Sequence, residues 1–172
     1  KEVYQSIAKQ NFIKSTSYIN YSIQLMEKVT IENVPDSPGV AARIFQAVSD
    51  AGVIIDMIIQ NVSKTGKTDI SFTLHRSDLT KAGETLDPLV KELGNSVFIE
   101  TTKGIGKLSV VGIGMRSHSG VAAQMFSALA DNGINIQMIS TSEIKTAVTI
   151  DESQLDQAAN VVHTAFNLSS ES

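Results

Sequence analysis

The residues best suited to chemistry in this sequence form the turn Asp36-Ser37-Pro38-Gly39-Val40, which opens a segment patterned like a helix. The first backbone N–H groups of a helix have no partner inside it, so they suit a carboxylate. Gly39 lets a ligand approach the backbone closely, and Asp36 is the first candidate to hold an ammonium group. The plainer alternative is that Asp36 or Ser37 only caps the helix and Gly39 only makes the turn. From these residues alone, the plainer alternative is better supported.

Other apparent motifs do not predict catalysis or a cofactor. The segment Gly112-Ile113-Gly114-Met115-Arg116-Ser117 partly resembles a dinucleotide fingerprint, but it lacks the third glycine and the later acid. His75, His118 and His163 are far apart and lack the spacing of metal ligands. No Ser-His-Asp arrangement stands out. We therefore expect no catalytic residue, no metal and no cofactor.

Composition narrows the class of protein further. The chain has 172 residues, a formal net charge of -4 and no cysteine, so neither a disulfide framework nor thiolate chemistry is expected. Nucleic acid is an unexpected partner because it requires a basic stripe. The longest apolar stretch, Val53 to Ile59, is interrupted by Asp56 and is too short to span a membrane. With no signal peptide visible, we expect a cytoplasmic protein.

An internal repeat determines the expected architecture. Gly39-Val40-Ala41-Ala42 recurs as Gly120-Val121-Ala122-Ala123, and the match continues at the same offset without a gap. Further along, at the same offset, the sequence Ile55-Asp56-Met57-Ile58 aligns with Ile136-Gln137-Met138-Ile139. So many matches in one register indicate a tandem duplication.

Each copy has the pattern strand, helix, strand, strand, helix, strand. In the first copy, alternation and turn residues place these elements at Val29–Val34, Val40–Ala51, Ile55–Val62, Asp69–Leu74, the stretch after Ser77-Asp78, and Val97–Glu100. This order predicts an α+β fold of the ferredoxin type, βαββαβ, with an antiparallel four-stranded sheet and helices on one face. Pro88 falls inside the second helix, where a kink or restart is expected.

The second copy ends before its fourth strand. Ile19, Tyr21, Ile23 and Leu25 alternate with polar residues, so this early segment is a candidate to complete the second sheet. We predict a first domain over residues 27–102 and a second over 103–172, completed by an N-terminal strand over 18–26.

Five segments carry a resemblance to a known family. Val34-Pro-Asp-Ser-Pro-Gly-Val-Ala-Ala-Arg-Ile-Phe45, residues 56–63 and residues 68–73 resemble the first regulatory domain of bacterial aspartate kinases. Residues 109–118 and Asn135-Ile-Gln-Met-Ile-Ser-Thr-Ser-Glu-Ile144 resemble the second. These tandem domains are called ACT domains. The Lys-Phe-Gly-Gly opening of the family's catalytic domain does not occur, so we expect a regulatory subunit or region and not an enzyme.

The resemblance implies an effector site in a seam between ACT domains. It implies threonine, lysine or both as ligands, a homodimer, and a catalytic aspartate kinase subunit as partner. Gln60 and Asn135 are candidates to contact the ligand's side chain. The implied effector-binding residues are Asp36, Pro38, Gly39, Val40, Ala41, Ile55, Asp56, Gln60, Asn135, Ile136 and Gln137. Two alternatives remain open: a dimerisation module without ligand binding, and a small enzyme that uses the interdomain cleft.

Overall fold

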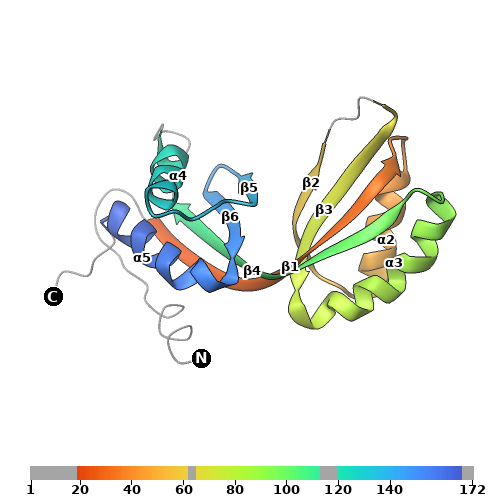
Figure 1. Cartoon of the computed structure of the whole chain (residues 1–172), viewed down its shortest axis with the longest axis horizontal. Coiled ribbons are helices and arrows are strands. Elements are labelled where there is room, and N and C mark those ends of the chain that lie inside the picture. Colours follow the sequence, from red (N-terminus) through yellow and green to blue (C-terminus); the bar gives the residue numbers. More distant parts are fainter. Residues whose placement is uncertain (1–18, 62–64, 113–119, 168–172) are drawn as a thin grey trace. The chain divides into compact units, whose positions relative to one another are not determined.

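The computed structural model describes residues 19–61, 65–112 and 120–167, which form two compact units (Figure 1). The contiguous unit consists of Met26–Lys103. The composite unit combines the chain up to Leu25 with the chain from Gly104 onward. Both units are ferredoxin-like, with an antiparallel sheet and two main helices, which confirms the predicted fold class.

The contiguous unit is built around the first copy of the repeat. Its sheet has the strand order β2-β3-β1-β4, and β1 pairs with β3 in the register Val29 to Phe72 and Ile31 to Ile70. Its elements are β1 (Ile19–Pro35), α2 (Val40–Asp50), β2 (Ile55–Gln60), β3 (Lys67–His75), the 3₁₀ turn η1 (Arg76–Asp78), α3 (Leu79–Leu93) and β4 (Phe98–Gly112). The helix α3 runs through Pro88 without a break in its bounds.

The composite unit holds the second copy. Its sheet has the order β1-β4-β6-β5, so the first residues of β1 supply the strand that the second copy lacks. Ile23 and Leu25 pack against its core, and Lys107 Nζ donates to Gln24 Oε1 at 2.7 Å. Its further elements are α4 (Val121–Asp131), β5 (Met138–Thr141), β6 (Lys145–Asp151), the 3₁₀ turn η3 (Glu152–Gln154) and α5 (Leu155–Ala165).

Two strands are longer than the sequence pattern indicates. The separate strands expected at 19–25 and 29–34 form one strand, β1, and the strand expected at 97–100 begins at Phe98 and continues as β4 to Gly112. No glycine or proline interrupts residues 26–28, so the backbone has no local reason to turn there. Each of these strands therefore contributes to both units.

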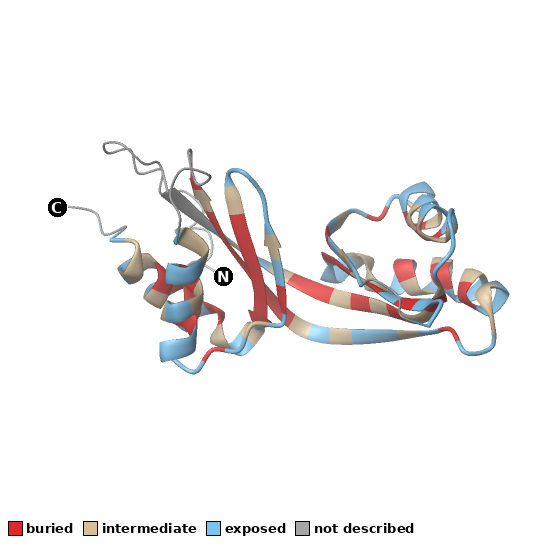
Figure 2. Cartoon of the chain, turned by 90° about the horizontal axis from the view of Figure 1, so that it is seen from above, coloured by how far each residue is buried: buried red, intermediate tan, exposed pale blue. Residues whose placement is uncertain are grey.

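Apolar side chains form one core in each unit, because the helices cover one face of each sheet with their apolar stripes. Figure 2 shows where the buried residues lie along the strands and helices. The contiguous core is centred on Ile31, Val34, Ile44, Val48, Ile70, Phe72, Leu74 and Leu86. The composite core is centred on Leu108, Val110, Met125, Leu129, Val148, Ile150, Leu155 and Val162. Within the described ranges, none of the helices is both long and apolar enough to cross a membrane.

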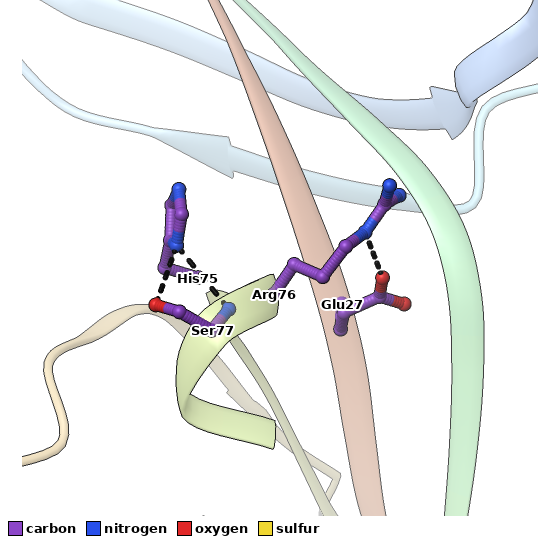
Figure 3. Close-up of polar contacts among 4 residues, drawn as sticks. All are labelled: Glu27, His75, Arg76 and Ser77. Carbon is purple, nitrogen blue, oxygen red and sulfur yellow. Dashed lines mark hydrogen bonds and ion pairs between the residues drawn. The ribbon is translucent and has the colours of Figure 1, made fainter. Parts of the chain in front are cut away.

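The end of β3 is tied to β1 inside the contiguous unit (Figure 3). Arg76 Nε donates to Glu27 Oε1 at 2.6 Å, and the Glu27 residue is only 1% exposed. His75 Nδ1 accepts the Ser77 N–H, and it also lies 2.9 Å from Ser77 Oγ. A buried carboxylate is costly without a partner, so Arg76 compensates its burial and fixes the turn that leads into α3.

Candidate functional site

The loop between β1 and α2 is a tight turn with a glycine in the left-handed conformation. Gly39 directly precedes the helix with φ 92°, a left-handed conformation that favours glycine. The Ser37 N–H donates to Pro35 O at 3.0 Å, and the Val40 N–H donates to Ser37 O at 3.3 Å. No side chain caps α2, so the expectation that Asp36 or Ser37 caps the helix is wrong. The positive φ of Gly39 makes the turn without a cap.

The first turn of α2 keeps free donors. The first N–H of this helix that bonds back to the turn is that of Arg43, which donates to Gly39 O at 3.0 Å. In the described part of the chain, the N–H groups of Ala41 and Ala42 have no acceptor. Two free N–H groups at the positive end of a helix dipole attract an anion such as a carboxylate.

A cavity of about 350 Å³ lies against this turn. It brings together six of the residues that the sequence singled out: Asp36, Pro38, Gly39, Val40, Ala41 and Gln60. Gln60 comes from the end of β2, so two elements far apart in sequence line one cavity. Pro35, Ser37 and Ile70 also line it and were not among the implied effector-binding residues. The alternation of apolar and polar residues along β3 predicts only that Ile70 is a core residue. No sequence signal connects Ile70 to the turn.

Ile55 and Asp56 do not line the cavity. Ile55 is half-buried against the contiguous core, and Asp56 is exposed on β2. The backbone of Asp36 is fixed from outside the turn, because its N–H donates to Gly66 O at 3.0 Å. No described residue forms a hydrogen bond with the Asp36 carboxylate, which is therefore available to a cationic group.

The second-copy residues belong to the composite unit. Asn135 is exposed just before β5, Ile136 packs against the composite core, and the Gln137 N–H donates to Thr149 O at 2.8 Å. Their proposed contact with an effector involves another copy of the first loop, and it stays a prediction. The second-copy turn residues Ser117, His118 and Ser119 lie outside the described residues. Within the described ranges, no group of three or more His, Asp or Glu side chains is arranged to hold a metal.

Acidic side chains gather beside the strand that enters the turn. The pKa of Glu32 on β1 is raised by partial desolvation, by a hydrogen bond with Glu100, and by the negative charges of Glu100 and Asp69. Three carboxylates that repel one another favour a proton on one of them. This cluster therefore makes the folded state of the contiguous unit sensitive to pH.

Replacing Glu32 by glutamine is expected to make the chain more resistant to urea at pH 7 and to have a smaller effect near pH 4. A raised pKa means that the folded state holds the proton more tightly than the unfolded state. The resulting stability is fully present below the ordinary pKa of 4.5 and is lost as the pH rises through the raised value. Urea unfolding at several pH values measures the difference, with Glu84→Gln on α3 as control. Equal pH profiles for Glu32→Gln and wild type would contradict the expectation.

Comparison with known proteins adds the family. The family model described as ACT domain matches residues 29–87 and 108–166. The chain is 52% identical over 141 residues to an aspartate kinase of Pseudomonas fluorescens, and 51% identical over 143 residues to an aspartokinase of Mycobacterium tuberculosis. These alignments cover 82% of this chain and 34% of each relative, so the chain spans about a third of the curated relatives' length.

This chain matches nearly the whole length of two solved chains. The ligand-free regulatory subunit of aspartate kinase from Thermus thermophilus is 36% identical, with a TM-score of 0.80, covering 85% of this chain and 96% of that one. A structure of aspartokinase alpha and beta subunits is 47% identical, with a TM-score of 0.78, covering 87% of this chain and 97% of the matched chain.

Proposed function

The chain belongs to the ACT domain family, and it is similar to the regulatory region of aspartate kinases and to their regulatory subunits; from that premise we propose that it is an allosteric regulatory subunit or region that binds threonine, lysine or both for feedback inhibition. The observation that carries the proposal is the cavity at the start of α2. It combines free N–H donors, an available carboxylate and an amide side chain, Gln60.

Each group of an amino acid has a complement there. The N–H of Ala41, which lines the cavity, and that of Ala42 in the same helical turn would donate to the carboxylate, and Asp36 would hold the ammonium. Gln60 would contact the side chain. We propose that threonine occupies this one site, with Asn135, Ile136 and Gln137 of another copy as its second wall. The chain would then not carry two equivalent sites, because the second copy has Ser117 where the first has Asp36.

The proposed partner is a catalytic aspartate kinase subunit, as in the related structure of alpha and beta subunits. Binding of an amino acid at the seam would favour one arrangement of the ACT domains, and that arrangement would hold the catalytic subunit in a less active state. Feedback control of this kind would place the chain in the cytoplasm, where amino acids are made.

We predict that the chain forms a homodimer. The strands β2 and β5 are the edge strands of the two units. On these strands Ile58 is 53% exposed and Ile139 is 46% exposed. Ile54, just before β2, is 78% exposed. Apolar side chains on unpaired strand edges favour association with a second copy. Sedimentation at micromolar concentration measures this, and a monomer with and without amino acids would contradict it.

A thermal-shift screen over free amino acids tests the proposed function. A ligand at about 100 times its Kd stabilises the folded state by about 2.7 kcal/mol. For a chain of this size the expected rise in Tm is about 5 to 10 °C. Threonine or lysine should produce it, and glycine and alanine serve as controls. No shift with any amino acid would favour the alternative function, a dimerisation module without ligand binding.

A further inference from the structure

The strand that leads into the cavity contains a bulge. The pairing of β1 with β3 shifts between Ile31 and Val34, so Glu32 and Asn33 interrupt the regular ladder. Asn33 has φ 58°, the left-handed conformation that asparagine tolerates better than most residues. A bulge of this kind stores strain and persists only when neighbouring groups hold it.

A carboxylate from the neighbouring strand holds this bulge. The Asn33 N–H donates to Asp69 Oδ1 at 2.9 Å, which gives the N–H an acceptor that the interrupted ladder does not supply. Hydrogen bonds to a charged acceptor are stronger than those between neutral groups. Pairing resumes directly afterwards, with Val34 opposite Thr68 and Pro35 opposite Lys67.

The bulge determines where the turn begins. A one-residue slip in a strand moves every following side chain to the opposite face of the sheet. Asp36 follows the bulge by three residues, and its N–H reaches Gly66 O only in the resumed register. Ile70, which follows Asp69 in β3, lines the same cavity. Asp69 therefore contacts the bulge that sets the register of the turn, and it directly precedes Ile70, which forms part of the cavity wall.

The second copy has no such carboxylate. Leu108 pairs with Val148 as Val29 pairs with Phe72, so Gly112 and Lys145 occupy the places of Asn33 and Asp69. The ladder there is regular up to Val111, and the Gly112 N–H donates to a backbone oxygen, Ile144 O, at 2.9 Å. Among the described residues, a bulge that is held by a carboxylate thus occurs in the first copy, which also contains Asp36.

We propose that Asp69 is a positioning residue for effector binding: by accepting the Asn33 N–H it fixes the β1 bulge, and the bulge orients Asp36 and the free N–H groups of α2 toward the ligand. This inference rests on the proposed function, because it assigns to Asp69 the preorganisation of the proposed site. Asp69 itself does not line the cavity.

The test compares Asp69→Ala with Asp69→Asn in the full chain, with threonine as the probe. Alanine removes the acceptor, whereas the asparagine side chain keeps an oxygen that accepts the Asn33 N–H. By calorimetry we expect the threonine Kd to rise about tenfold or more in Asp69→Ala and to return to within about threefold of wild type in Asp69→Asn. Asp151→Ala is the matched control, because Asp151 Oδ1 accepts the Ser153 N–H at 2.8 Å in the composite unit.

Hydrogen exchange at the Asp36 N–H gives a second readout that needs no ligand. Protection should fall in Asp69→Ala and stay near wild type in Asp69→Asn and Asp151→Ala. Equal affinities and equal protection in Asp69→Ala and wild type would overturn the proposal, as would equal losses in the alanine and asparagine variants. If wild type binds neither threonine nor lysine, the proposed function fails; unchanged Asp36 protection in Asp69→Ala would overturn the positioning role as well.

Discussion

Replacing Asp36 by alanine is expected to weaken threonine binding by about 1.5–3 kcal/mol, a rise in Kd of roughly 10- to 150-fold. Asp36 is the acidic side chain among the residues that line the cavity, and no described residue forms a hydrogen bond with its carboxylate. Its partner in the complex would be the ligand's ammonium, so the variant loses a charge-assisted hydrogen bond. Titration calorimetry on the full chain measures the change.

Two controls separate the local contact from general effects. Asp50→Ala removes the same charge from the other end of α2 and should leave the Kd nearly unchanged. Ser117→Ala, in the second-copy turn, should matter much less than Asp36→Ala, because a serine offers only a neutral hydrogen bond. If Ser117→Ala abolishes threonine binding while Asp36→Ala leaves it intact, the roles of the two turns are reversed.

Phe72→Ala should destabilise the contiguous unit by about 3–5 kcal/mol, because it empties a large volume at the centre of a core. Phe72 is fully buried on β3, and its ring meets that of Phe45 on α2 edge to face, with centroids 5.7 Å apart. This contact joins the sheet to the helix whose first turn forms the site. Urea unfolding followed by residue-resolved hydrogen exchange should show the loss in the contiguous unit.

The matched variant lies in the other core. Leu129→Ala should cost about 2–5 kcal/mol in the composite unit, because Leu129 is equally buried on α4. Phe72→Leu should cost less than Phe72→Ala, because leucine fills more of the space. Loss of protection confined to the composite unit in Phe72→Ala would contradict the assignment of Phe72 to the contiguous core.

Local sequence signals predicted the individual elements well. The apolar stripe of Val40, Ile44 and Val48 predicted α2, and the alternation of Ile70, Phe72 and Leu74 predicted β3. The turn before α2 was recognisable because glycine and proline act on the backbone within a few residues. The merging of short strands into β1 and β4 was not predictable, because no local feature marks a strand that continues from one sheet into another.

The candidate site was predictable only in part. Asp36, Gly39 and Gln60 belong to motifs that the family resemblance identified, and the cavity brings them together. Ile70 and Asp69 escaped notice because their roles depend on the register between β1 and β3. That register is a long-range property, determined by the bulge at Asn33 and by its contact with a residue much later in the chain.

The shared strand β1 has a consequence for the order in which a ribosome can complete the two units. Residues 26–103 emerge together, so the contiguous unit has all its strands once Lys103 is outside. The segment up to Leu25 emerges earlier, but its partners in β4, β6 and α5 follow only later. At bacterial and eukaryotic synthesis rates that delay is on the order of ten seconds. During it Ile23 and Leu25 lack their native contacts with the composite core.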